Sequence, residues 1–152
     1  GDYSSLTYDG TNTDVIDAVA GVSNLYKFEL KGTNSFEQKI VSSRENGTTY
    51  VEQTLAITLK TQAIATHKFV KLLSYGRPHV VVKNKNNQYF FAGLEYGMDV
   101  TEGAIQNGTV AGDMSGYSLT FVGMEKLPAN FIDCATDTAL ATLFGSATIV
   151  TS

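Results

Sequence analysis

The sequence contains no tryptophan, one cysteine and two prolines among its 152 residues. A single cysteine, Cys134, excludes an intrachain disulfide. The longest apolar runs fall far short of the roughly 20 residues that cross a bilayer, so the sequence predicts neither a transmembrane segment nor membrane insertion. Without tryptophan, the chain also lacks the side chain best suited to form a platform for a sugar ring.

Positive charge is scarce as well. The chain has 11 Lys and Arg against 15 Asp and Glu, a net charge of −4. Sequence-independent binding of nucleic acid needs a basic surface, so the composition argues against such binding. A hydrophobic fraction of 43% with 17% charged residues is typical of a globular chain with one core. We expect an N-terminal arm over residues 1–22, with one helical turn or a short strand at 14–21, and a single domain over 23–152.

Motifs that would indicate an enzyme are missing from the sequence. There is no glycine-rich phosphate-binding motif of either common kind. His67 and His79 are isolated in the sequence, whereas zinc needs three or four Cys, His or carboxylate ligands. A pairing of Cys134 with a histidine in space is possible in principle, but a small half-buried cysteine is the more ordinary interpretation. The sequence therefore predicts no catalytic residue, no metal and no cofactor, and hence no enzyme.

Alternating apolar and polar side chains predict several strands. Residues 24–32 and 117–125 alternate clearly, and 35–61 reads as two strands joined at Asn46-Gly47, a hairpin signal. A second hairpin is expected over 79–95, with Gly93 marking a bulge or a close approach. The C-terminal tail predicts a short helix near 137–144 and a closing strand at 147–151.

One segment, residues 62–75, has the spacing of a helix instead. Thr61 can cap its N-terminus, Gly76 follows its last turn, and Pro78 prevents its continuation. We expect this to be the only long helix, packed on a sheet by its apolar residues Ile64, Ala65, Phe69, Leu72 and Leu73. One helix against several antiparallel strands predicts a mainly β fold: an antiparallel β-sandwich or barrel with one flanking α-helix.

Between Asp99 and Ser115 the sequence shows no periodicity. Long loops in compact domains are usually functional or disordered. This one carries Ile105 and Val110, which suit a segment that becomes ordered when a neighbouring subunit covers it. The sequence therefore predicts an assembly loop over 102–114, with plain disorder as the alternative. Its candidate subunit-contact residues are Glu102, Gly103, Ala104, Ile105, Gln106, Asn107, Val110, Asp113 and Met114.

The stretches "QYFFAGLEYGMDVT" (88–101) and "GDMSGYSLTFVGME" (112–125) carry a family resemblance. With the strands before them, over residues 23–132, they resemble virion structural proteins of tailed phages and prophages of Bacteroidetes-type hosts, in the tail-tube group. The resemblance implies a virion tail-tube or tail/neck ring subunit, made in the host cytoplasm. Such subunits form hexameric rings that can stack, contact other tail or neck proteins, and let DNA pass non-specifically. It makes Asp99, Glu102 and Asp113 candidates for an acidic lumen.

Two other classes of function stay open at this point. A β-sandwich binding module could recognise a glycan or a protein on a cell surface, although the missing tryptophan weighs against the glycan. A small hydrolase could use Cys134 or the carboxylates Glu95, Asp99, Glu102 and Asp113, which flank the long loop. A solvated acidic rim is the more ordinary interpretation of those carboxylates.

Overall fold

A computed structural model of the chain describes residues 3–60, 62–113 and 115–151. The protein is mainly β, with several sheets and two helices in this described part. Its residues form two compact units, and the chain passes back and forth between them. The first unit comprises Gly1–Phe28, His79–Ala92 and Ala129–Ser152; the second comprises Glu29–Pro78 and Gly93–Pro128.

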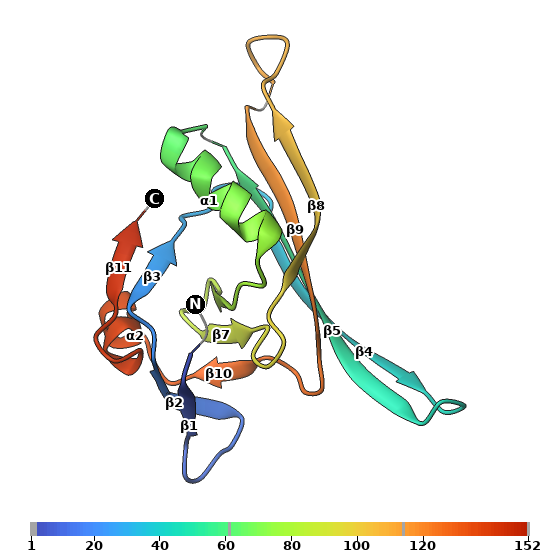
Figure 1. Ribbon diagram of the computed structural model, residues 1–152, viewed down its shortest axis with the longest axis vertical. Coiled ribbons are helices and arrows are strands. Elements are labelled where there is room, and N and C mark those ends of the chain that lie inside the picture. Colours follow the sequence, from blue (N-terminus) through green and yellow to red (C-terminus); the bar gives the residue numbers. More distant parts are fainter. Residues whose placement is uncertain (1–2, 61, 114, 152) are drawn as a thin grey trace. The chain divides into compact units, whose positions relative to one another are not determined.

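The first unit contains a five-stranded sheet and a two-stranded sheet (Figure 1). The larger sheet has the order β1 (Ser5–Tyr8), β2 (Val15–Ala20), β10 (Asn130–Ile132), β7 (Tyr89–Ala92) and β6 (Val80–Lys83). The smaller sheet pairs β11 (Thr148–Thr151) with β3 (Asn24–Lys27) in parallel. Helix α2 (Asp137–Leu143) completes the unit, capped by the Thr136 hydroxyl, which accepts a hydrogen bond from the Ala139 amide.

Aromatic and branched side chains form the core of the first unit. Ile16 is fully buried, and Tyr89 and Phe91 are 2% exposed. The Phe91 ring stacks nearly parallel to that of Phe144, with 6.1 Å between the ring centroids. Alternation explains this core, because Tyr89 and Phe91 lie two residues apart and share one face of the sheet.

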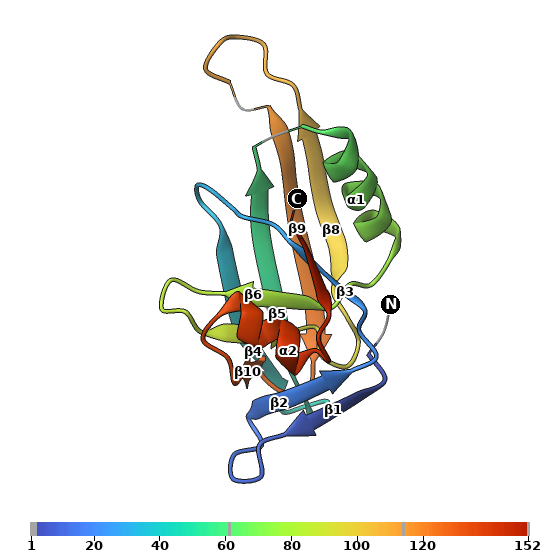
Figure 2. The ribbon, with the colours of Figure 1, turned by 90° about the vertical axis from the view of Figure 1, so that its left-hand side faces the viewer.

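The second unit is built on one antiparallel four-stranded sheet. Its order is β4 (Ser35–Ser43), β5 (Thr48–Leu59), β9 (Gly116–Glu125) and β8 (Asp99–Gln106). Helix α1 (Ile64–Tyr75) runs alongside β8 (Figure 2). Leu55 lies opposite Phe121 and Leu59 opposite Tyr117, which puts these residues on one face of the sheet. That face is covered, since its central side chains Val51, Leu55, Tyr117, Leu119 and Phe121 are all buried.

Two buried polar side chains hold the turn between β7 and β8. The Gln53 side-chain carbonyl accepts a hydrogen bond of 2.9 Å from the Gly93 amide. The Glu125 carboxylate, 4% exposed, accepts from the amides of Glu95 and Tyr96 at 3.0–3.2 Å. The turn needs Gly97, because its φ is +73° and a Cβ there would lie 2.8 Å from the Arg77 carbonyl oxygen.

Helix α1 has the expected extent but buries a different face. It begins at Ile64, with Ala63 at the N-cap, and ends before Gly76. Thr61, the expected cap, lies outside the described residues. Val70 and Thr66 are buried, whereas Ile64 is 93% and Leu72 60% exposed. The predicted packing is therefore wrong for Ile64, Ala65 and Leu72, which are exposed, while Phe69 and Leu73 are half-buried.

The physical reason is that apolar residues occur nearly all round this helix, so hydrophobic spacing alone does not select one face. Thr66, Val70 and Leu73 follow the spacing i, i+4, i+7 and form the stripe turned inward. Beside them, the His67 Nδ1 lies 3.3 Å from the Tyr117 hydroxyl on the covered face of the sheet. Packing against that face sets the rotation of the helix.

Residues 99–106 form a strand, which corrects the expectation of a loop from Asp99 onward. Strand β8 pairs with β9 from Asp99–Val122 to Gln106–Gly116, with a bulge between Val100 and Glu102. The segment shows no clear alternation because β8 is an edge strand that exposes nearly all of its side chains. Its neighbour β9 imposes the extended conformation. Of the described residues, 107–113 and 115 remain as the connection to β9.

Other expectations are confirmed, and some need adjustment. The hairpins β4–β5 and β6–β7, strand β9, the short helix α2, the closing strand β11 and the close approach at Gly93 are all present. Strand β3 ends at Lys27, short of the expected 32. Residues 14–21 form a strand, β2, and the segment expected to be an arm supplies β1 and β2 to the large sheet.

The expectation of an antiparallel β-sandwich or barrel also needs correction. The pairs β10–β2 and β11–β3 are parallel, so the fold is not purely antiparallel. Within the described residues no sheet closes into a barrel. The described helices include none long and apolar enough to cross a membrane.

The rotation of α1 leads to a paired mutational test. Val70→Ala removes two buried methyl groups, so we expect it to lower the free energy of unfolding by about 1.5–3 kcal/mol. Leu72→Ala, at an exposed position of the same helix, should change it by less than about 0.5 kcal/mol. Urea unfolding followed by circular dichroism measures both. Equal effects of the two substitutions would contradict the assigned rotation.

Candidate functional site

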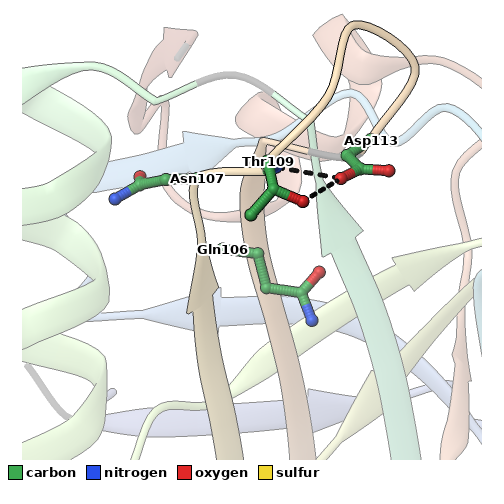
Figure 3. Close-up of a pocket in the computed structure, with 5 residues that line it drawn as sticks. Gln106, Asn107, Thr109 and Asp113 are labelled. Carbon is green, nitrogen blue, oxygen red and sulfur yellow. Dashed lines mark hydrogen bonds between the residues drawn. The ribbon is translucent and has the colours of Figure 1, made fainter.

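The connection between β8 and β9 carries the candidate site, and its described part is closed by one carboxylate. Asp113 Oδ2 accepts hydrogen bonds from the Thr109 amide and hydroxyl, both at 2.9 Å, and from the Val110 amide at 3.1 Å (Figure 3). Gly108 makes this compact turn possible, with φ of +65°. The turn is therefore ordered by its own residues.

These hydrogen bonds also fix the charge of Asp113. The Thr109 amide, followed by the Thr109 hydroxyl and the Val110 amide, lowers the pKa of this carboxyl below its ordinary value. All three groups donate to the ionised form and so stabilise it. The carboxylate is consequently charged at neutral pH, and its charge is used to close the turn.

We call the connection between β8 and β9 the tip. A second contact anchors the start of the tip to the segment before α1. The Gln62 amide group donates to the Gln106 carbonyl at 2.7 Å and to the Asn107 side-chain oxygen at 2.8 Å. The tip encloses an open hollow lined by Gln106, Asn107, Gly108, Thr109 and Asp113. In Figure 3 the side chains of Gln106 and Asn107 point away from the Thr109–Asp113 pair, so these polar groups do not converge on one point.

The tip region exposes apolar side chains. Ile105 is 55% and Val110 72% exposed. Of the other expected contact residues, Glu102, Gly103 and Ala104 are exposed along β8, and Met114 lies outside the described residues. An ordered, protruding hairpin with exposed apolar side chains is suited to contact another surface. Its chemistry does not indicate catalysis.

The acidic residues that flank this region are not brought together. Asp99 forms an ion pair of 3.2 Å with Arg77, and Glu95 one of 3.5 Å with Lys126. Asp113 sits at the opposite end of β8 from Asp99. Asp99 and Gln106 are seven positions apart in extended chain, roughly 24 Å at the rise of a strand. Glu102 lies between the two ends, so these carboxylates form no paired site.

Within the described ranges, no three His, Cys, Asp or Glu side chains lie close enough to hold a metal ion. The His79 ring packs 5.2 Å from that of Tyr3 and 6.0 Å from that of Phe91, between centroids. Burial, followed by the charges of Asp133 and Asp137, raises the pKa of the Cys134 thiol to about 11. Such a thiol stays protonated and is a poor nucleophile at neutral pH.

The densest polar cluster of the first unit centres on Asp137. Its carboxylate accepts from the Tyr89 hydroxyl at 2.6 Å and lies 2.8 Å from the Lys27 ammonium and 3.4 Å from that of Lys83. These partners, Lys27 first and Tyr89 next, hold the pKa of Asp137 well below its usual range. The four residues come from β3, β6, β7 and α2, so the cluster joins both sheets of the unit to the helix.

No known protein family, curated protein or solved structure matches this chain. The function proposed below therefore rests on the sequence resemblance and on the geometry of the site.

Reasoning from the sequence misses two residues of the site, Thr109 and Gln62, and it names Asp113 without its role in closing the turn. Thr109 and Asp113 form the turn, and the signal for it was present, because Asp and Thr near glycine commonly accept or donate to nearby backbone groups. Gln62 has no comparable signal. Its contacts with Gln106 and Asn107 span more than 40 positions of sequence and depend on the fold.

The closed turn predicts a local effect of Asp113. Asp113→Ala should remove all three acceptor contacts, so the amide of Val110 should exchange with solvent markedly faster. Amide hydrogen exchange by NMR at neutral pH measures this. Asp99→Ala, which removes a carboxylate from the far end of β8, is the matched control and should leave that amide unchanged. An unchanged exchange rate in the Asp113 variant would show that other contacts close the turn.

The lowered pKa of Asp137 predicts a pH dependence of stability. The unfolded-state pKa of aspartate is near 3.9. Because the folded-state value is lower, the stabilisation is complete above the unfolded value and is lost as pH falls through the folded one. Asp137→Asn should cost about 1–2 kcal/mol at pH 7, allowing for solvent screening. Denaturant melts at pH 7 and at pH 2–3 should show the parent and variant converging in acid; a difference that is constant with pH would contradict the assignment.

Proposed function

We propose that this chain is a virion structural protein of a tailed phage or prophage. It is a tail-tube or tail/neck ring subunit that assembles into hexameric rings. The observation that carries the proposal is strand β8, an exposed sheet edge that leads directly into a protruding, ordered tip. The family resemblance over residues 23–132 and the mainly β fold support it. In this proposal the sheets form a β-sandwich of the kind typical of that group.

The free edge of β8 supplies the means of assembly. Strand β8 ends the order β4-β5-β9-β8 and pairs within this sheet only with β9. An edge strand presents backbone N–H and C=O groups on its outer side, and an extended segment of another chain can pair with them. A neighbouring subunit can therefore continue the sheet at β8 or cover its edge.

The apolar residues of the tip supply affinity. Ile105 and Val110 are more than half exposed, and fully burying such a side chain contributes about 1.5–3 kcal/mol. Binding also costs about 0.5–1.5 kcal/mol for each flexible side chain that becomes ordered. Asp113 closes the turn before any partner arrives, so less backbone entropy remains to be lost on assembly. The tip is thus preorganised for a protein contact.

The same proposal gives the acidic residues a part in a DNA conduit. A bore that repels phosphate lets DNA pass without binding it. The net charge of −4 suits such a surface. Glu102 is the first candidate for the lumen, since Asp99 is paired with Arg77 and Asp113 is engaged in the turn. The partners are then copies of this chain, other tail or neck proteins, and passing DNA; neither an enzymatic reaction nor a cofactor is required.

A shortened tip tests the proposed function. Deletion of residues 108–112 removes Val110 and leaves a short connection between β8 and β9, which long surface loops tolerate at small cost. We expect a folded subunit that no longer forms rings or tubes. Light scattering and negative-stain electron microscopy of the parent and the variant measure this.

The hairpin β6–β7 offers a matched control. Replacing its tip, residues 84–87, by Asn-Gly shortens an exposed turn in the other unit and should leave assembly intact. If the 108–112 deletion forms the same particles as the parent, β8 and its tip are not the assembly contact. A parent that remains a folded monomer at all concentrations and binds a glycan or a cell-surface protein would favour the binding-module alternative.

A further inference from the structure

The solvent-facing side of α1 is unusually apolar for an exposed surface. Successive helix residues are turned by about 100°, which places Ile64, Lys68, Lys71, Leu72 and Tyr75 within an arc of about 100°. This arc lies opposite the buried residues Thr66 and Val70. Ile64 is 93%, Leu72 60% and Tyr75 86% exposed. We call these five residues the helix stripe: three large apolar side chains with two lysines among them.

The charges of the chain are segregated along the sequence. Residues 53–94 contain six Lys and Arg and no Asp or Glu, although acidic residues outnumber basic ones in the whole chain, 15 to 11. Residues 1–26 show the reverse, with four Asp and no Lys or Arg. Helix α1 lies within the basic segment, and strands β1 and β2 lie within the acidic one. The chain thus carries segments of opposite charge.

The five-stranded sheet has a matching surface on the face turned away from Ile16 and Phe91. One rung of its ladder joins four apolar residues: Val15 is opposite Phe131, Phe131 opposite Phe90, and Phe90 opposite Val82. Phe131 is 41% exposed, and its ring centroid lies 4.6 Å from that of Phe90. We call these four residues the aromatic row.

Two carboxylates stand at the β2–β10 end of the aromatic row. Asp133 directly follows the last residue of β10, at a bend of the chain, and is exposed. Asp17 is the extra residue of the bulge in β2, beside Val15, and is exposed. The row is therefore apolar with an acidic end, whereas the helix stripe is apolar with two lysines.

We propose that the helix stripe of one copy docks on the aromatic row of a second copy of this chain, with Lys68 and Lys71 facing Asp17 and Asp133. The inference rests on the proposed function, because it names a second self-contact beside β8 and its tip. The charge complementarity of the two surfaces selects a copy of this chain as the occupant. Ile64, Leu72 and Tyr75 supply most of the affinity, while exposed ion pairs set orientation and association rate.

This contact joins two different surfaces, so it is heterologous. After two copies dock, one still offers its aromatic row and the other its helix stripe to a further copy. Such contacts generate closed rings or open filaments and do not stop at a dimer. The docking is thus of the kind that a ring-forming or tube-forming subunit requires.

A charge reversal with rescue tests the docking. Lys68→Glu combined with Lys71→Glu should weaken self-association at least about tenfold, as measured by sedimentation velocity across a concentration series. Adding Asp17→Lys and Asp133→Lys to the same chain reverses both surfaces and should restore association. Lys31→Glu with Lys85→Glu gives the same change in net charge at other exposed positions and should leave association near that of the parent. Circular dichroism confirms that each variant is folded.

The outcomes separate this inference from the proposed function. If the Lys68/Lys71 variant associates like the parent while the 108–112 deletion does not, the docking is wrong and the assembly role stands. Loss of association without rescue by the Asp17/Asp133 changes overturns the aromatic row as the docking surface. A parent that stays monomeric at every concentration overturns both proposals. As a variant without reversed charge, Ile64→Ser with Tyr75→Ser should also weaken association, and unchanged association there contradicts the docking.

Discussion

Strand β9 is paired along both of its edges, and this double pairing determines the architecture of the second unit. Its residues meet β5 from Leu59–Tyr117 to Val51–Glu125 and meet β8 on the other side. Because alternate side chains point to opposite faces, the register of β9 decides which residues of both neighbours are covered. Helix α1 can then pack only by a side that fits this covered face. The connection after β8 is forced to project beyond the last rung of the ladder.

The parts of the fold that sequence reasoning predicts are those whose signals are local. Strand β9 alternates between buried and half-buried residues, and the hairpins β4–β5 and β6–β7 carry turn residues between two alternating runs. The parallel pairing of β11 with β3 joins residues more than 120 positions apart, and no local sequence pattern predicts it. Strand β8 is missed for a related reason. An exposed edge strand needs no apolar alternation, because its conformation is set by the neighbour.

Sequence reasoning likewise finds only the part of the candidate site that has a local signal. The exposed apolar residues Ile105 and Val110 could be recognised in the sequence as unusual for a solvated loop, and both are exposed in the structure. The closed turn at Asp113 and the anchor at Gln62 depend on distances that only the folded chain supplies. The rotation of α1 shows most clearly what the sequence alone does not predict. With apolar residues on most sides of a helix, only the surface that it meets decides which of them stay outside.

The edge strand itself constrains the symmetry of any assembly built on it. The midpoint of β8 lies between Glu102 and Gly103. A two-fold pairing of two β8 strands centred on Glu102, next to this midpoint, would place the two Glu102 side chains directly opposite each other. Like charges at such close positions destabilise a strand pair, and the bulge between Val100 and Glu102 interrupts the ladder at the same place. Both features disfavour a closed two-fold dimer through β8. A contact between β8 and a different surface of the next copy avoids the repulsion, and contacts of that kind form closed rings or open filaments.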